Sequence, residues 1–325
     1  MAVILVPGGA GYIGSFTCRA LAAAGHTPIT LDNLSTGHRE CVQGEWVEGD
    51  IREGGSVREL LARRKVAAVI HFAACIEARE SVGDPGKFYD VNVGGQIALL
   101  EACRDVGIPA FVFSSSCATY GVPQYLPIDE AHPQAPISPY GRTKLMCEWM
   151  VRDYAAAYGF RYAALRYFNA AGGNEAGRLG EWHQPESHLI PLALDAVARG
   201  RTLRIFGVNH GTPDGTCIRD YIHVEDLALA HVLALDHLLR GGENLELNLG
   251  TGTGHSVREV VASVERVVGR KVPVLEVEAQ PGDQPQLVAD VRRAREVLGF
   301  TCRRADLDDI VASAWAFHRR LLERK

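Results

Sequence analysis

A glycine-rich segment, Gly8–Gly14, most constrains what this chain can fold into. It reads GGAGYIG, follows the short apolar stretch Val3–Val6 and opens the helical pattern Ile13–Ala24. Glycines at this spacing make a tight turn beneath a helix N-terminus, where backbone N–H groups and the helix dipole bind a pyrophosphate. An ordinary strand–helix turn is the alternative, but the flanking strand and helix supply the context that a dinucleotide site requires.

The rest of the first half alternates short apolar stretches with helical patterns, which is typical of a parallel sheet covered by helices on both faces. We expect strands at Val3–Val6, Thr27–Leu31, Ala67–His71, Ala110–Ser115 and Arg161–Arg166. We expect helices near Ile13–Ala24, Val57–Arg64, Pro85–Val106 and Pro139–Tyr158. The predicted class is α/β: a doubly wound parallel sheet of the Rossmann type, with a smaller C-terminal α/β lobe.

The pattern changes after Tyr167, where a long polar connection runs from Gly172 to Ser187 before a helix at about His188–Arg199. A connection of this length is more typical of a binding loop than of a plain connector. We therefore predict a dinucleotide-binding domain at 1–167 and a second lobe at 168–325.

Composition excludes several classes of partner. The formal net charge is -5 and the basic residues are scattered, which disfavours nucleic acid and acidic membranes. The eight cysteines form no C-x-x-C pair, and neither they nor the histidines show metal-site spacing, so free thiols and no metal are expected. Val3–Val6 is too short for a signal peptide or membrane span. We expect a reduced, soluble, cytoplasmic protein.

The second predicted strand ends at Leu31-Asp32-Asn33. A carboxylate at this point accepts hydrogen bonds from both ribose hydroxyls and repels a 2′-phosphate, so Asp32 favours NAD over NADP. Arg39 lies in a loop seven residues further on and is interpreted as a solvated charge. Asp50 and Ile51 are predicted at the adenine edge.

A reactive group is predicted where a helix begins after Ser138-Pro139. Tyr140 and Lys144 are four residues apart and share a helical face. A tyrosine base near pH 7 needs its pKa lowered by about three units, which a neighbouring ammonium and a positive nicotinamide ring would supply. The alternative is that Tyr140 and Lys144 form an ordinary pair on the surface of an amphipathic helix. Ser116, at the end of a predicted strand, favours a catalytic group because ligands of such sheets bind beyond that edge.

Serine, tyrosine and lysine in this order, behind a glycine-rich first turn, resemble the extended short-chain dehydrogenase/reductase family. Longer segments resemble its UDP-glucose 4-epimerases, and the resemblance covers essentially the whole chain. These segments are Gly8–Gly14, Leu31–Leu34, Gly49–Arg52, His71–Ala74, Ser114–Gly121, Leu165–Asn169 and Arg219–Val224.

The resemblance implies NAD as cofactor, a UDP-sugar substrate, a homodimer built through long helices of the cofactor domain, and catalysis by Ser116, Tyr140 and Lys144. It implies cofactor contacts at Gly8, Gly11, Tyr12, Ile13, Gly14, Asp32, Asn33, Asp50, Ile51, Phe72, Ala73, Ala74, Asn92, Ser114, Tyr140, Lys144 and Tyr167. Substrate contacts follow at Ser116, Tyr140, Asn169, His188, Leu189, Phe206, Arg219, Tyr221 and Asp283. Residues 168–325 become the nucleotide-sugar lobe, with 219–240 returning to the first domain.

The expected reaction is epimerisation at C4 of UDP-glucose or UDP-galactose through a transient 4-keto sugar. Dehydration is disfavoured, since related dehydratases need an acid and a base after the active serine or threonine, and Cys117 and Ala118 stand there. Open alternatives are a 4-epimerase of UDP-N-acetylhexosamine or of UDP-xylose/UDP-arabinose, and a net reductase. A non-catalytic NAD-binding sensor is disfavoured because it would not need the reactive trio.

Four positions depart from the family pattern. Pro7 replaces a common threonine, and Ile76 replaces a lysine near the cofactor phosphates. Gln280 replaces an arginine that grips the diphosphate, a loss of about 1.5–3 kcal/mol unless Arg204 or Arg292 compensates. Leu287 is smaller than the tyrosine of strict glucose/galactose enzymes, which points to a broader substrate range.

Overall fold

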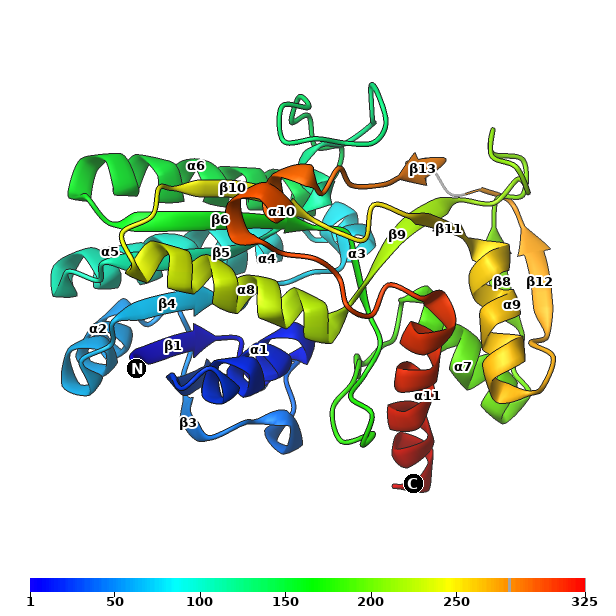
Figure 1. The fold of residues 1–325 in the computed structure, drawn as a ribbon, viewed down its shortest axis with the longest axis horizontal. Coiled ribbons are helices and arrows are strands. Elements are labelled where there is room, and N and C mark those ends of the chain that lie inside the picture. Colours follow the sequence, from blue (N-terminus) through cyan, green and yellow to red (C-terminus); the bar gives the residue numbers. More distant parts are fainter. Residues whose placement is uncertain (280–281, 325) are drawn as a thin grey trace.

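The larger unit of the fold is a parallel sheet of seven strands. In the computed structural model, which describes residues 1–279 and 282–324, the strands lie in the order β10-β6-β5-β4-β1-β2-β3 (Figure 1). The order reverses between the neighbours β1 and β4, and ligands of such sheets bind beyond the carboxyl ends at that reversal. Their bounds are β1 Val3–Pro7, β2 Thr27–Asp32, β3 Glu45–Glu48, β4 Ala68–His71, β5 Ala110–Ser116, β6 Arg161–Tyr167 and β10 Leu245–Leu249.

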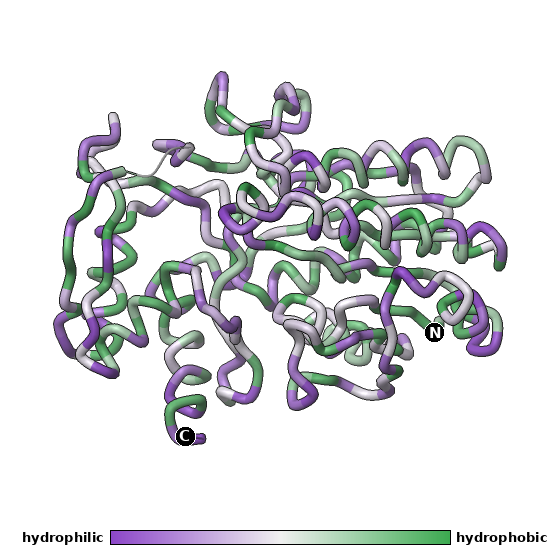
Figure 2. The backbone as a smooth tube through the Cα atoms, turned by 180° about the vertical axis from the view of Figure 1, so that it is seen from behind, coloured by the Kyte–Doolittle hydropathy of each residue, from purple (hydrophilic) through white to green (hydrophobic). Residues whose placement is uncertain are grey.

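Helices cover both faces of this sheet. Along β1, Ile4 and Val6 pack into one core and Leu5 into the other, which explains why the strands are continuously apolar. Figure 2 shows apolar residues concentrated along these strands. One face carries α1 Tyr12–Ala23, α8 Val224–Leu239 and α10 Arg292–Leu298; the other carries α2 Gly54–Arg64, α5 Gly95–Val106 and α6 Pro139–Tyr158.

The predicted class and all five predicted strands are confirmed, with ends that differ by one residue at most. The predicted helix at Pro85–Val106 is divided: α4 (Pro85–Phe88) passes through the π-helical turn η2 (Tyr89–Gly94) into α5. The short helix α3 (Ala78–Gly83) precedes it. Strand β3 was not predicted, because it is a half-exposed edge strand without an apolar stretch.

The smaller lobe is built from short strands and three longer helices, as expected for an α/β lobe (Figure 1). Strand β9 (Ile218–His223) is flanked by β7 (Asn169–Ala171), β11 (Gly254–Ser256) and β13 (Gln286–Leu287). Strands β8 (Leu203–Phe206) and β12 (Val274–Val277) form a separate parallel pair. Helices α7 (Leu189–Arg199), α9 (Val257–Val268) and α11 (Leu307–Glu323) enclose one apolar core with them.

The chain crosses between the two units more than once. Helix α8, within the predicted returning segment 219–240, packs against the large sheet. Strand β10 also joins that sheet beside β6, with Leu247 and Leu249 fully buried. The large unit thus takes in more of the second half than 219–240, while the functional division at 167 stays a prediction. No helix in the described part of the chain is long and apolar enough to cross a membrane.

A buried ion pair fastens α6 to the sheet. Arg166 in β6 donates hydrogen bonds to both carboxylate oxygens of Glu148 in α6, at 2.7–3.2 Å, and both side chains are 1% exposed. Arg166 also contacts Glu246 and the Tyr120 hydroxyl, and Ser115 donates to Glu148. Because α6 carries Tyr140 and Lys144, this pair positions the predicted reactive group.

Replacing Arg166 with methionine would leave the Glu148 carboxylate buried without its counter-charge. We expect Arg166→Met to lower the free energy of unfolding by about 3–5 kcal/mol, measured by urea denaturation. The control is Arg152→Met, whose side chain is 47% exposed and pairs with Glu246; we expect a loss under about 1 kcal/mol. Equal losses in the two variants would contradict the role assigned to Arg166.

Candidate active site

The turn Gly8–Gly14, which we call the glycine cradle, is packed so closely that side chains do not fit at two of its glycines. A Cβ on Gly14 would lie 2.2 Å from the Gly8 carbonyl oxygen, and one on Gly8 would lie 2.5 Å from the Ala73 nitrogen. Gly8 also has a φ of +80°, a conformation that favours glycine. Helix α1 begins at Tyr12, directly after the turn, so its free N–H groups face the cradle. The residues therefore fit a pyrophosphate held by backbone alone.

Asp32 ends β2 beside this cradle. Its two carboxylate oxygens accept hydrogen bonds from the backbone N–H groups of Ala10, at 3.0 Å, and Leu34, at 2.8 Å. Burial raises the pKa of Asp32, and these two hydrogen bonds counteract the rise. Asn33 donates to Asp50 at 2.9 Å, so the predicted ribose and adenine residues lie together. Leu31 and Asp50 also line a cavity of about 600 Å³ with Val57.

Asn92 holds the loop after β4 in place. Its amide accepts a hydrogen bond from the Cys75 nitrogen and donates to the Cys75 carbonyl and the Thr143 hydroxyl, at 2.8–3.0 Å. The side chain is buried, and the π-helical turn η2 aims it inward. Asn92 therefore ties the segment around Cys75 to α6 through Thr143.

Strands β5 and β6 bring three predicted residues to one edge. Ser114 and Ser116 lie on β5, and Ser116 is in register with Tyr167 at the end of β6. The Ser114 hydroxyl and the Tyr167 hydroxyl share a hydrogen bond. Ser116 accepts the Ala118 N–H at 3.1 Å, which starts a 3-10 turn and turns the chain away from the sheet.

Helix α6 presents Tyr140 and Lys144 to the same edge. Ser138 caps the helix by accepting the Gly141 N–H, and Pro139 occupies the first turn. The Lys144 ammonium is buried and donates to the Ser114 carbonyl at 2.8 Å. Ser116, Tyr140 and Lys144 are thus brought together, as the sequence predicted.

The electrostatics of Tyr140 show what the protein supplies without the nicotinamide ring. Burial raises the pKa of its phenol above the ordinary value, Tyr167 raises it further, and a hydrogen bond with Ser116 lowers it. Burial also lowers the pKa of Lys144 to about 8. The Lys144 ammonium is engaged by Ser114 and lies 6.0 Å from the centre of the Tyr140 ring. The protein alone therefore does not supply the predicted depression, and a phenolate requires a further positive charge beside it.

Two predicted substrate residues are neighbours in the second sheet. Asn169 on β7 is in register with Tyr221 on β9. Arg219, also on β9, donates two hydrogen bonds at 2.8 Å, to the carbonyls of Ile218 and Gln284. These bonds fix the guanidinium between β9 and the segment that carries Asp283.

A cavity of about 800 Å³ is lined by residues of β8, of β12 and of the segments that follow them, among them Arg204, Phe206 and His210. Phe206 is a predicted substrate contact, and the Arg79 guanidinium lies over its ring, 5.2 Å from the ring centre. His188 precedes α7, and Leu189 is its first residue. Sequence reasoning missed the contact of Arg79, which sits in a short helix with no motif to mark it.

The departures from the family pattern lie at the predicted cofactor and substrate contacts. Ile76 is 40% exposed in the loop after β4. Gln280 lies outside the described residues. Arg292, a predicted substitute for the missing arginine, is held by Asp290 through hydrogen bonds of 2.6–3.0 Å, so it is engaged elsewhere. Arg204 lines the cavity of Phe206 and remains the better candidate.

Ser81 is a further residue that sequence reasoning missed. Its hydroxyl accepts the backbone N–H of Tyr140 at 3.1 Å and donates to the Ala78 carbonyl. It ties α3 to the start of α6, and a lone serine 59 residues from Tyr140 offers no local signal of that contact.

Known proteins resemble this chain over its whole length. A UDP-glucose 4-epimerase of Rhizobium meliloti (strain 1021) is 54% identical over 319 residues, covering 98% of this chain and 97% of that protein. The crystal structure of a Brucella ovis UDP-glucose 4-epimerase in complex with NAD is also 54% identical, with a TM-score of 0.95 and coverage of 98% and 99%. A Stenotrophomonas maltophila UDP-glucose-4-epimerase, with bound NAD and formylated UDP-arabinopyranose, has a TM-score of 0.97 at 37% identity and full coverage of both chains.

The family match agrees with the glycine cradle, the buried lysine and the strand order. Residues 4–250, more than half of the chain, match one family, so the chain belongs to the NAD dependent epimerase/dehydratase family.

Proposed function

We propose that this protein interconverts UDP-glucose and UDP-galactose by inverting C4 through a transient 4-keto sugar. The observation that carries the proposal is the arrangement of Ser116, Tyr140 and Lys144 at the carboxyl edge of the sheet, the same edge that carries the glycine cradle. The neighbours Cys117 and Ala118 offer no carboxylate for eliminating water. The relatives with the highest identity reported above carry the same activity in their names.

NAD fits the cradle because that turn excludes side chains and Asp32 stands beside it. We assign the pyrophosphate to Gly8, Gly11, Tyr12, Ile13 and Gly14, the adenosine to Asp32, Asn33, Asp50 and Ile51, and the nicotinamide side to Phe72, Ala73, Ala74, Ser114 and Tyr167. When bound, NAD would supply a reversible hydride acceptor and a positive charge near Tyr140.

Tyr140 acts as the base that takes the proton of the sugar 4-hydroxyl and returns it after inversion. Ser116 shares a hydrogen bond with Tyr140, so it can bridge the phenol and the sugar oxygen. Lys144 is too firmly bound to Ser114 to move with the proton. Its role is to anchor α6 and to add positive potential to a dry site.

Inversion requires a firm grip on UDP and a loose grip on the hexose, because both faces of the sugar must meet the same groups. We assign the diphosphate to Asn169 and Arg219. The uridine is assigned to His188, Leu189, Phe206, Tyr221 and Asp283. Arg219 suits a diphosphate because its planar fork pairs with two oxygens at once.

A second candidate is a 4-epimerase of another UDP-sugar. Leu287 favours it, since this half-buried side chain in β13 packs with Phe168 and Tyr120 and leaves more room than a tyrosine would. The Stenotrophomonas relative, with bound formylated UDP-arabinopyranose, shows that a neighbour of similar fold accommodates a different sugar.

We also propose a homodimer formed through α5 and α6 in a reducing, cytoplasmic setting. Met146 and Trp149 are three residues apart on α6 and are exposed, as is Ile97 on the neighbouring helix α5. Apolar side chains gathered on adjoining helices are typical of an interface. All eight cysteines are free, in keeping with a reducing compartment.

Removing the phenol hydroxyl tests the proposed base. We expect Tyr140→Phe to lower kcat for UDP-galactose by about 100- to 10,000-fold, because the variant lacks the phenol oxygen that takes the 4-hydroxyl proton. The bound NAD, measured after denaturation of the protein, should be retained. The control is Tyr154→Phe on the same helix, whose hydroxyl bonds Glu101 and which should keep its activity. Full activity of Tyr140→Phe would refute the assignment.

Enlarging position 287 tests the breadth of the sugar pocket. We expect Leu287→Tyr to lower kcat/KM for UDP-N-acetylgalactosamine by about 10-fold or more, with a smaller effect on UDP-galactose, because the added ring occupies the space of the N-acetyl group. The measurement is a competition assay with both sugars. An equal loss for the two substrates would show that Leu287 does not select between them.

A further inference from the structure

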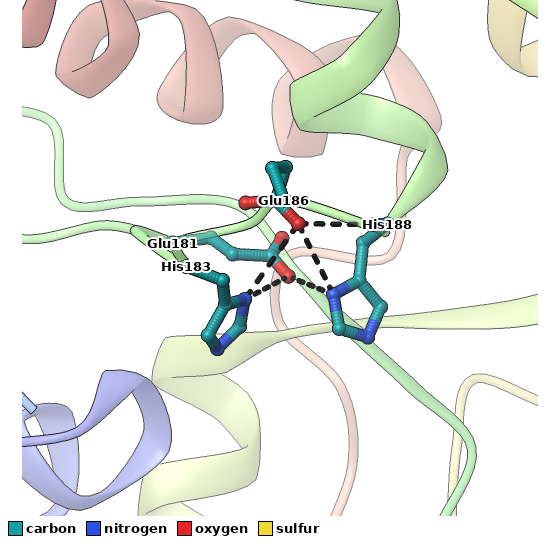
Figure 3. Close-up of side chains that lie close together, drawn as sticks. All are labelled: Glu181, His183, Glu186 and His188. Atoms are coloured by element: carbon teal, nitrogen blue, oxygen red, sulfur yellow. Dashed lines mark hydrogen bonds and ion pairs between the residues drawn. The ribbon is translucent and has the colours of Figure 1, made fainter. Parts of the chain in front are cut away.

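Two histidines and two glutamates from the loop before α7 point their side chains toward one another (Figure 3). They are Glu181, His183, Glu186 and His188. Each offers one ligand atom, and the four atoms lie within 4.8 Å of one another. Imidazole nitrogen and carboxylate oxygen are the ligands that divalent transition metals take in proteins.

The distances between these atoms fit a tetrahedron around one ion. The Nδ1 of His183 lies 3.4 Å from a Glu181 oxygen and 3.7 Å from a Glu186 oxygen. The Nδ1 of His188 lies 2.8 and 3.4 Å from the same two atoms. Zinc bonds of about 2.1 Å place neighbouring ligands of a tetrahedral site about 3.4 Å apart. The four ligand atoms need only small shifts to meet that geometry.

The two imidazole nitrogens face the carboxylates of Glu181 and Glu186, with which they form ion pairs. Both Nδ1 atoms are buried, and neither makes a hydrogen bond within the described residues despite its short distances to the carboxylates. The Glu181 side chain is 6% exposed. Glu186 Oε1 also accepts the backbone N–H groups of Ser187 and His188, at 2.8 and 2.9 Å, as the carboxylate ligands of metals commonly do. Two imidazole nitrogens that face the same two carboxylate oxygens form a donor set that suits one cation.

We propose that Glu181, His183, Glu186 and His188 bind one divalent transition-metal ion, with Zn²⁺ as the best match. The dication would neutralise the two carboxylates while both imidazoles stay neutral. Four protein ligands leave no position open for water or substrate, so the site is structural rather than catalytic. His188 is 39% exposed, which gives the ion a route of entry.

The site would fasten the loop between β7 and α7 to the cofactor domain. The ring of His183 packs edge-on against Tyr12, whose hydroxyl donates to the Gly172 carbonyl at 2.6 Å. Trp182, between two of the ligands, stacks on His38 with ring centres 3.6 Å apart. Because His188 directly precedes α7, an ion at this site would also fix the start of that helix relative to the glycine turn.

The first test uses untagged wild-type protein, because an affinity tag binds metals itself. We expect elemental analysis to find about one zinc ion per chain after growth with zinc. Removal by a chelator should lower Tm, and adding Zn²⁺ back should raise it by about 3 °C or more. Refilling with Co²⁺ should give the intense visible absorption of a four-coordinate site. Protein without stoichiometric zinc that also fails to bind Co²⁺ would overturn the proposal.

The second test assigns the ligands. We expect Glu181→Gln and His183→Ala each to lose the stoichiometric ion and the Co²⁺ absorption. The control is His26→Ala, which removes a histidine paired with a single carboxylate, Asp236, at 3.0 Å and should keep the ion. Retention of the ion by both ligand variants would place it elsewhere and overturn the assignment. If either variant fails to fold, the wild-type Co²⁺ spectrum still decides whether the protein binds a metal ion at a four-coordinate site.

Discussion

The candidate site depends on one buried hydrogen bond between a helix and a strand. The Lys144 ammonium, almost inaccessible to water, donates to the Ser114 carbonyl and so fixes α6 against β5. A buried ammonium is stable only when its donors find partners, so this contact sets the position of the helix and not merely its charge. The Arg166–Glu148 pair fastens the same helix further along. Together they place Tyr140 beside Ser116, at the edge of the sheet that also carries the glycine turn.

Much of the large sheet could be predicted because its signals are local. The stretch Val3–Val6, the glycine turn and Asp32 follow one another in sequence, and each has a short-range pattern. Tyr140 and Lys144 were recognisable by helical spacing together with Ser116 at the end of a predicted strand. Strand β3 was not, since a half-exposed edge strand has no apolar stretch. Strand β10 was also not predicted, although Leu245–Leu249 alternates apolar and polar residues, because nothing local shows that it returns to the first sheet. Their positions depend on the assembled sheet.

Features that depend on contacts between residues distant in the chain could not be predicted from the sequence. The sequence near Glu148 does not indicate Arg166 as its ion-pair partner. The burial that raises the pKa of Tyr140 is likewise a property of the folded site. No metal site was expected, because the histidines lack familiar spacing. The order Glu181-x-His183-x-x-Glu186-x-His188 would have been the signal, but an irregular loop gives no reason to expect four side chains to converge. The loop links the two units, so its order affects cofactor and sugar together.

The central claim is that the same carbon is oxidised and reduced within one closed site, with Tyr140 moving the proton. The most direct test is to incubate the protein with UDP-galactose carrying deuterium at C4 and to analyse the UDP-glucose formed by mass spectrometry. The account predicts UDP-glucose that keeps the deuterium at C4, with no net NADH formed. Loss of the label to solvent, or NADH accumulating in step with product, would contradict it.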